Sequence, residues 1–180
     1  MRIMPEDSLL FVIDMQEKLV RAMYEKEKLE ERTLMLIRGV HGMEIPIMLS
    51  QQYTRGLGGS LPAVYDAAGS SRYFEKSSFS CWRDDDIRQA LHDSKRRNIL
   101  IAGTEAHVCV LQTCIDLKAD GFEPVLVTDC IGSRRENDRE YGIRRAMQEG
   151  ITVTTAEAIL FELLQDSKSP YFKKISGLVK

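Results

Sequence analysis

The sequence predicts a single-domain α/β protein with a mostly parallel central sheet and helices on both faces, in three αβα layers. Two observations carry this prediction. Short apolar runs recur along the chain, each about as long as one buried strand. Segments with the spacing of amphipathic helices separate these runs, as in consecutive β-α-β units. Strands this apolar need cover on both faces, and a chain of 180 residues has an ordinary length for one domain.

The predicted elements follow one another in a regular order. The strands are residues 8–13, 45–50, 98–102, 123–128 and 151–154. Apolar residues recur at helical spacing over residues 29–40, 108–115 and 156–164. Two pairs have the spacing of capping boxes at helix starts, Asn137 with Glu140 and Thr154 with Glu157.

Two segments depart from the alternation. Residues 51–60 contain three glycines and follow the second predicted strand, at the sheet edge where α/β proteins bind ligands, so we expect a long flexible loop there. After Ser169-Pro170 the chain again carries apolar residues at helical spacing. We therefore divide the chain into a domain of residues 1–165 and an amphipathic tail of residues 166–180. The tail either covers the domain's own core or docks on a neighbouring subunit.

Composition excludes several classes of protein. The chain has 25 Lys and Arg against 27 Asp and Glu, so it lacks the charge expected of a partner of nucleic acid or of an anionic membrane. The first apolar run stops at Asp14, so we expect neither a signal peptide nor a membrane span. The four cysteines form no CxxC pair, which indicates neither a zinc site nor a disulfide framework. We predict a cytoplasmic protein with reduced thiols.

Three side chains stand where this fold class exposes reactive groups. Asp14 follows the first strand and faces the ligand crevice, unless it only caps the next helix. Cys109 lies where a helical pattern begins, and a helix N-terminus favours the reactive thiolate; the alternative is a small buried apolar residue. Lys76 is either a solvated surface lysine or, beside the other two, a charge that lowers the thiol pKa and stabilises an oxyanion.

The three residues together, with their neighbours, resemble the isochorismatase-like cysteine hydrolases, a family that also contains nicotinamidases and carbamoylsarcosine amidases. The resemblance rests on IDMQ at 13–16, EKSSFS at 75–80 and GTEAHVCV at 103–110, in that order. It covers nearly the whole chain, and the third motif is the most specific. The tail, with FKKI at 172–175, looks like a small bacterial subgroup of mostly uncharacterised hydrolases.

The resemblance implies a mechanism and a set of site residues. Asp14 would take the thiol proton, Cys109 would attack an amide carbonyl to form a thioester, and Lys76 would be the electrostatic partner. The oxyanion hole would use the backbone N–H groups of Glu105 and Cys109, with a cis peptide between Thr104 and Glu105. The expected substrate is a small molecule, and the family is commonly homo-oligomeric.

Departures from the family pattern narrow the expectation. Nicotinamidases carry an Asp-x-His cluster after the second strand to hold a metal, whereas this chain has QQYT at 51–54. We therefore expect no metal and no cofactor. Isochorismatases proper do not need the cysteine, so Cys109 argues for an amide or another acyl-type carbon instead of isochorismate.

Four further residues are candidates for the substrate pocket. Gln16 is placed to orient Asp14, and Tyr53, Phe79 and Trp82 offer aromatic faces to a flat substrate; for each, plain packing is the alternative. Cys81, Cys114 and Cys130 have no activating context in the sequence.

Three other functions remain open. A catalytically silent binding or scaffold protein would keep the fold with an ordinary thiol. A thiol redox protein would oxidise and recycle Cys109, although no resolving cysteine lies nearby in the sequence. A receiver-like domain with Asp14 as phosphoacceptor would leave Cys109 unexplained.

Overall fold

The apolar runs form strands that lie side by side in one sheet. The computed structural model describes residues 2–180. Its strands are β1 (Ser8–Ile13), β2 (Ile47–Gln52), β3 (Phe74–Lys76), β4 (Asn98–Gly103), β5 (Glu123–Ile131) and β6 (Thr152–Thr154). They form a six-stranded sheet in the order β3-β2-β1-β4-β5-β6, and every neighbouring pair is parallel. Because the strand order reverses direction between β1 and β4, their carboxyl ends flank the point where this fold class binds ligands.

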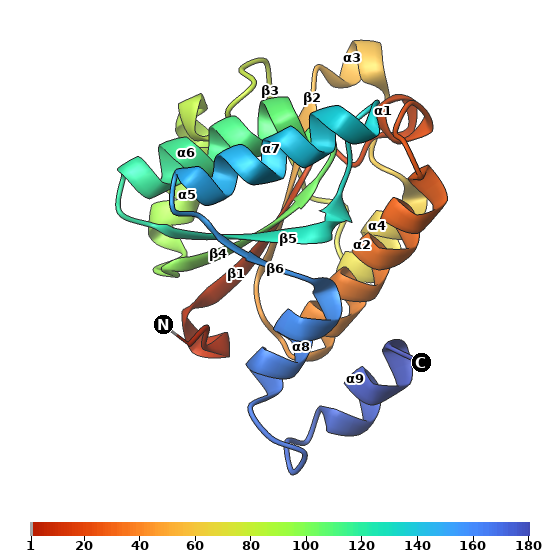
Figure 1. The fold of residues 1–180 in the computed structure, drawn as a ribbon, viewed down its shortest axis with the longest axis vertical. Coiled ribbons are helices and arrows are strands. Elements are labelled where there is room, and N and C mark those ends of the chain that lie inside the picture. The colour runs from red at the N-terminus through yellow and green to blue at the C-terminus, as the bar shows by residue number, and fades with distance from the viewer. Residues whose placement is uncertain (1) are drawn as a thin grey trace.

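Helices connect the strands and cover both faces of the sheet. They are α1 (Glu17–Arg21), α2 (Lys26–Gly42), α3 (Thr54–Leu57), α4 (Pro62–Ala68), α5 (Asp85–Asp93), α6 (Leu111–Ala119), α7 (Glu136–Gln148), α8 (Ala156–Leu164) and α9 (Phe172–Leu178). Short turns of helix precede β1 (η1, Pro5–Asp7), α5 (η2, Cys81–Arg83) and α6 (η3, Ala106–Val110). Figure 1 shows α5, α6 and α7 on one side of the sheet and α2, α4 and α8 on the other. The predicted three-layer αβα architecture is confirmed.

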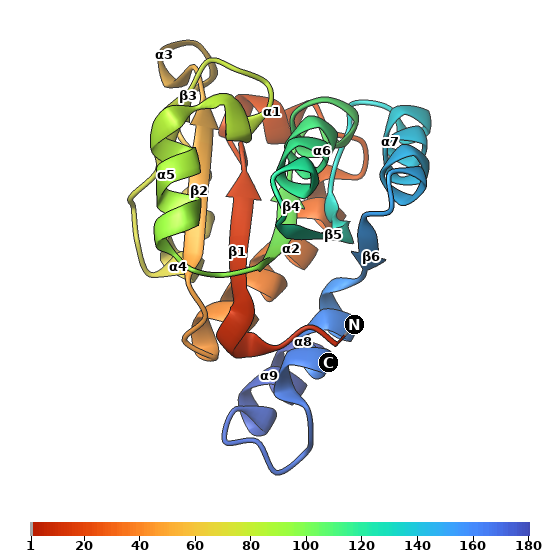
Figure 2. The same ribbon diagram turned by 90° about the vertical axis from the view of Figure 1, so that its left-hand side faces the viewer.

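The two faces are built from alternate residues of the strands. In β1, Leu9, Phe11 and Ile13 join the core under α5 and α6, whereas Leu10 and Val12 join the core under α2 and α8. Alternation of this kind follows from the pleat, which sends successive side chains to opposite faces. In Figure 2 the head of the β1 arrow lies at the end of the molecule that carries α1 and α3, and both chain termini lie toward the other end.

The structure corrects part of what the sequence predicts about helix caps and strand ends. The side chain of Thr155, not Thr154, caps α8 by accepting a hydrogen bond from the Ala158 N–H at 3.4 Å. Helix α7 starts after Arg135, with no side-chain cap, so the capping role of Asn137 is wrong. Within the loop expected over residues 51–60, β2 continues to Gln52 and α3 follows, because Gln51 and Gln52 pair with Glu75 and Lys76 of β3.

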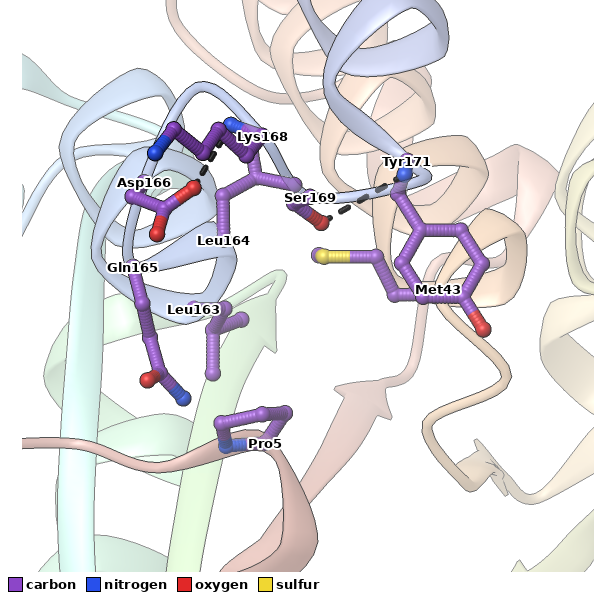
Figure 3. A pocket seen from close by; sticks show the side chains of 9 residues that line it. All are labelled: Pro5, Met43, Leu163, Leu164, Gln165, Asp166, Lys168, Ser169 and Tyr171. Carbon is purple, nitrogen blue, oxygen red and sulfur yellow. Dashed lines mark hydrogen bonds between the residues drawn. The ribbon is translucent and has the colours of Figure 1, made fainter.

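The tail covers the core of its own chain. In α9, Ile175 is fully buried and belongs to the hydrophobic cluster formed with α2 and α8, and the Tyr171 hydroxyl donates to Glu44 Oε2 at 3.2 Å. The segment between α8 and α9 lines a cavity of about 370 Å³ with Pro5 and Met43, seen in Figure 3. Pro5 precedes β1 and Met43 precedes β2, so this cavity lies at the amino ends of the strands.

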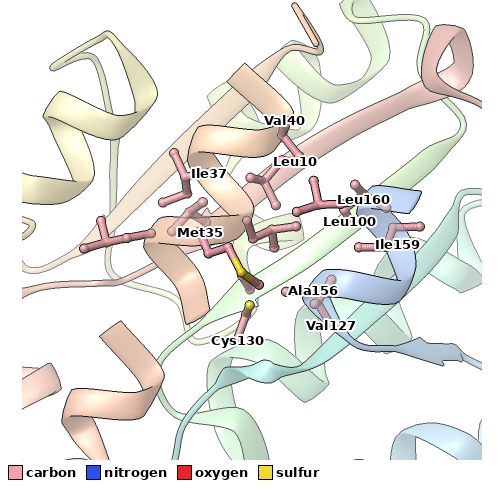
Figure 4. Close-up of a cluster of buried hydrophobic side chains, with 14 of the residues drawn as sticks. Leu10, Met35, Ile37, Val40, Leu100, Val127, Cys130, Ala156, Ile159 and Leu160 are labelled. Carbon is pink, nitrogen blue, oxygen red and sulfur yellow. The ribbon is translucent and has the colours of Figure 1, made fainter. Parts of the chain in front are cut away.

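Figure 4 shows the cluster on the α2 side of the sheet. Strands β1, β4 and β5 contribute Leu10, Leu100 and Val127, and the helices contribute Ile37, Val40, Ile159 and Leu160. Burial of each such side chain is worth about 1.5–3 kcal/mol. The core therefore holds the strands in register, and their carboxyl ends become a rigid platform. No helix in residues 2–180 combines the length and the apolar character needed to cross a membrane.

Candidate active site

The backbone is strained at three neighbouring strand ends. Asp14 after β1, Tyr53 after β2 and Glu105 after β4 adopt left-handed conformations, with φ of 53°, 39° and 57°. Such a conformation costs a non-glycine residue about 1–3 kcal/mol and persists only where the surroundings enforce it. The three residues border the point where the strand order reverses, which marks this edge of the sheet as the candidate site.

Asp14 and Lys76 form a buried ion pair across this edge. Both side chains are 0% exposed, and Lys76 Nζ lies 2.7 Å from Asp14 Oδ2. Lys76 reaches the pair from the short strand β3, and its burial rules out the solvated-lysine alternative. Lys76 Nζ also donates to Gln52 Oε1 at 2.6 Å and to the Ser78 carbonyl at 3.2 Å. Since an ammonium has three N–H bonds, all of them have acceptors within the protein.

Neighbouring groups keep Lys76 in its protonated, charged form. Burial by itself lowers the pKa of Lys76, but Cys81, Asp14 and Cys109 together raise the pKa above its ordinary value. Cys81 is a neutral thiol at neutral pH, because burial raises its pKa to about 12. Asp14 is therefore the charge that keeps Lys76 protonated under those conditions, and Lys76 acts on its surroundings through its field.

The second oxygen of Asp14 is also fixed. Ser50 Oγ donates to Asp14 Oδ1 at 2.8 Å, and Cys81 Sγ lies 3.7 Å from the same Ser50 hydroxyl. The carboxylate is thus held at one oxygen by Ser50 and at the other by Lys76. Sequence reasoning missed Ser50 because a serine inside an apolar run carries no signal of its own.

Gly103 lets the turn that carries Cys109 approach β1. Gly103 has φ of +144°, and a Cβ atom there would lie 2.1 Å from the Ile13 carbonyl oxygen, so any side chain would clash with backbone. The next residue, Thr104, donates its N–H to that same oxygen at 3.0 Å and its hydroxyl to the Asp14 carbonyl at 2.7 Å. These bonds fix the turn against the residue it must face.

Cys109 lies in η3, a π-helical turn that leads into α6, and is 5% exposed. Such turns occur often at functional sites. Within the turn, the N–H groups of Val108 and Val110 donate to the Glu105 carbonyl, and the Ala106 N–H donates to Gly132.

The thiol of Cys109 is protonated at rest. Burial raises its pKa to about 12; the Lys76 charge lowers the pKa, and Asp14 raises it through its negative charge and as a hydrogen-bond acceptor. The sequence-based expectation of a thiolate favoured by a helix N-terminus is therefore wrong. Removal of the thiol from water outweighs the attraction of Lys76, so formation of a thiolate here requires a base.

Cys81 also belongs to the candidate site, although the sequence did not indicate it. It is fully buried, and its backbone N–H donates to Thr113 Oγ1 at 2.9 Å, while the same hydroxyl donates to the Cys109 carbonyl at 2.7 Å. Cys114 and Cys130 are also buried, and burial raises the pKa of both thiols well above the ordinary value.

The four predicted pocket residues divide into two pairs. Gln16 is fully buried and donates to the carbonyl groups of Gln52 at 3.0 Å and Gly58 at 2.6 Å, so it braces the backbone after β2 instead of lining a pocket. The ring of Trp82 packs edge-on against His92 and Phe122, with centroids 5.4 and 5.5 Å apart, which is the packing alternative.

Tyr53 and Phe79 stay at the surface beside the ion pair. Each is 57% exposed. The Tyr53 N–H donates to the Lys76 carbonyl at 3.1 Å, and the Phe79 carbonyl lies 3.4 Å from Lys76 Nζ. The backbones of both residues therefore border the site, and the role of their rings in a substrate pocket stays a prediction.

The peptide bonds within residues 2–180 are all trans, so the expected cis peptide between Thr104 and Glu105 is wrong. The chain turns here instead through the positive φ angles of Gly103 and Glu105. Among the same residues, no group of three or more His, Cys, Asp or Glu side chains is arranged to hold a metal ion.

Comparisons with known proteins show the family and the fold of the chain. Residues 8–158 match the family model of the isochorismatase domain. Isochorismatase family protein 1B of Dictyostelium discoideum is 30% identical over 183 residues, which cover 99% of this chain and 89% of that protein. The structure of MAR1 ribonuclease from Caenorhabditis elegans has a TM-score of 0.92 and 32% identity, covering 99% of this chain and 92% of that one. The YcaC gene product of Escherichia coli, described as an octameric hydrolase of unknown specificity, has a TM-score of 0.92 at 22% identity, covers 98% of this chain and 88% of its own, and shares the fold.

Proposed function

The chain belongs to the isochorismatase family of hydrolases, and we propose that it hydrolyses a small amide or a related C–N bond through a covalent intermediate on Cys109. One observation carries the proposal: a nearly buried thiol lies beside a carboxylate that accepts hydrogen bonds, next to a lysine whose protons have acceptors in the protein. This arrangement supports the roles of nucleophile for Cys109, base for Asp14 and fixed positive charge for Lys76.

The first half of the reaction forms a thioester. Asp14 accepts the proton of the Cys109 thiol as the sulfur attacks the carbonyl carbon. The negative charge then moves to the carbonyl oxygen, and the N–H groups of Glu105 and Cys109 are the donors that we propose for it. A donor of this kind is worth about 10²–10³ in rate. Asp14 returns the proton to the leaving nitrogen, and the C–N bond breaks.

The second half releases the acid. Asp14 takes a proton from a water molecule that attacks the thioester, and the carbon–sulfur bond breaks as Cys109 leaves as a thiolate. The proton on Asp14 then restores the thiol. Lys76 stabilises negative charge on this side of the site through its field throughout the cycle, since its N–H bonds are directed at protein acceptors.

The direct test compares two buried cysteines. A panel of small amides is assayed for ammonia or amine release with the wild type, Cys109→Ala and Cys130→Ala, and intact-mass spectrometry records any acyl adduct. Cys130 is the matched control because it is buried under the opposite face of the sheet. We expect turnover and adduct in the wild type and in Cys130→Ala and neither in Cys109→Ala. Turnover that survives in Cys109→Ala would refute covalent catalysis.

Ribonuclease activity is a second candidate, because the relative from Caenorhabditis elegans is described as a ribonuclease. The net charge of −2 argues against it, since RNA binding relies on cationic contacts to phosphate. Incubation of the same three proteins with a labelled single-stranded RNA separates the two activities. Cleavage that exceeds every amide rate and survives Cys109→Ala would favour the ribonuclease.

Two further parts of the proposal concern assembly and location. We propose a homo-oligomer, and light scattering over a range of concentrations measures its mass. A cytoplasmic location also remains a prediction; the four unpaired cysteines fit a reducing compartment.

A further inference from the structure

We infer that Ser50 and Gln52, two residues of β2 on the same side of the strand, are positioning residues that hold the Asp14–Lys76 pair from both ends. The inference rests on the proposed function, because the pair matters for catalysis only if Cys109 is the nucleophile.

The first support is the alternation of β2. Successive side chains of a strand point to opposite faces, so Ser50 and Gln52 share one face and Gln51 lies on the other. Gln51 accordingly bonds to a different set of partners: its side chain donates to Ser60 Oγ at 3.2 Å and accepts from Thr54 Oγ1 at 3.0 Å. The face with Ser50 and Gln52 meets the ion pair.

The second support is that Ser50 and Gln52 contact different members of the ion pair. Ser50 Oγ lies 2.8 Å from Asp14 Oδ1, the carboxylate oxygen that Lys76 does not contact. Gln52 Oε1 lies 2.6 Å from Lys76 Nζ. Ser50 therefore holds Asp14 by the oxygen that Lys76 does not contact, and Gln52 holds the Lys76 ammonium beside its bond to Asp14.

The third support is that Gln52 is itself fixed. Its amide nitrogen donates to the Ser77 carbonyl at 2.8 Å, which sets the amide with its oxygen toward Lys76. Its backbone N–H donates to Gln16 Oε1 at 2.7 Å, and its carbonyl accepts from Gln16 Nε2 at 3.0 Å. Residues held in this way keep a reacting group in its productive geometry.

The consequence concerns the reactivity of Cys109. The charged or titratable groups that act on it are Asp14, Lys76 and Cys81. Without the Ser50 hydroxyl, the charge of Asp14 is less compensated and opposes thiolate formation more strongly. Without the Gln52 oxygen, Lys76 is less firmly held, and its stabilisation of the thiolate weakens. Both changes move the reaction of Cys109 to higher pH.

The test follows alkylation of Cys109 by iodoacetamide against pH, with peptide mass spectrometry as the readout, so that no substrate is needed. The variants are Ser50→Ala and Gln52→Met, and Gln51→Met is the matched control on the opposite face. We expect the alkylation curve of each β2 variant to move up by about one pH unit, which is a tenfold lower rate at fixed pH. We expect Gln51→Met to lose thermal stability but to keep the wild-type alkylation curve. If Ser50 and Gln52 had a merely structural role, the alkylation curves of all three variants would move alike.

The outcomes distinguish the inference from the proposed function. If wild-type Cys109 does not react, the proposed function fails and the positioning role falls with it. If the wild type reacts and Ser50→Ala and Gln52→Met follow its curve, the positioning role is wrong while the proposed function stands. A Gln51→Met curve displaced as far as that of Gln52→Met also overturns the inference.

Discussion

Replacement of Lys76 by methionine tests the buried ion pair most sharply. The Lys76 and Asp14 side chains are both 0% exposed, and the two charged atoms lie 2.7 Å apart. Methionine keeps most of the volume of the lysine stem, so the cavity it leaves is small. The main effect is an unpaired carboxylate in the interior. Breaking a buried pair by removal of one partner costs about 3–5 kcal/mol.

The assay is urea unfolding of the wild type, Lys76→Met, Asp14→Asn and the double variant. In a parallel thermal melt, a loss of that size lowers the melting temperature of a domain of this length by roughly 6–20 °C. The double variant removes both charges together, so we expect it to recover most of the stability lost in Lys76→Met, with a coupling energy of about 2 kcal/mol or more.

Two results would refute this reasoning. An unfolding midpoint of Lys76→Met equal to that of the wild type would mean that the pair is hydrated in solution. A double variant as unstable as the sum of the two single variants would mean that the residues stabilise the protein independently, without a shared ion pair.

Three further predictions concern other parts of the chain. Gly103→Ala should cost about 3 kcal/mol, because its Cβ would lie 2.1 Å from the Ile13 carbonyl oxygen, whereas Gly177→Ala, within α9 and with nothing within 4 Å, should cost nothing and add up to about 1 kcal/mol of stability in the same urea unfolding assay. Ile175→Ala should cost about 2–5 kcal/mol at every protein concentration if α9 covers its own core, and a dependence on concentration would indicate an interface instead. The pKa of Cys81 is raised from 9.0 to about 12, mainly by burial, so its stabilising contribution is present below pH 9 and is lost as the pH rises toward 12. Unfolding of the wild type and Cys81→Ala at several alkaline pH values should therefore give a difference in stability that narrows as the pH rises; a constant difference would contradict the raised pKa.

The sequence predicted more of the fold than of the site. The strands from residues 8–13 and 98–102 were predicted within one residue of the observed ends, since an unbroken apolar run has few other ways to be buried. Strand β3 has only three residues and no pattern of its own. Its place beside β2 depends on parallel pairing, such as Gln52 with Lys76, between segments that are distant in the chain.

Site residues divide in the same way. Asp14, Lys76 and Cys109 stand out in the sequence because each combines a reactive group with a position at a strand end or in a motif. Ser50 and Cys81 do not, because an uncharged small residue in a buried segment has no distinguishing chemistry until its neighbours are known. The expected thiolate at Cys109 was wrong for a related reason: burial, which sets its pKa, is a property of the packed molecule.

The sequence by itself determined the alternation of strands and helices, and with it the three-layer architecture, because periodicity and hydrophobicity are local properties. It also placed an acid, a lysine and a cysteine at the strand ends and turns. Only the tertiary structure decided that Lys76 bonds to Asp14 and Gln52, that Ser50 holds the other carboxylate oxygen, and that the tail packs on its own core. The physical reason is that ion pairing, desolvation and close packing depend on distances between residues far apart in the chain, and those distances exist only once the sheet has formed.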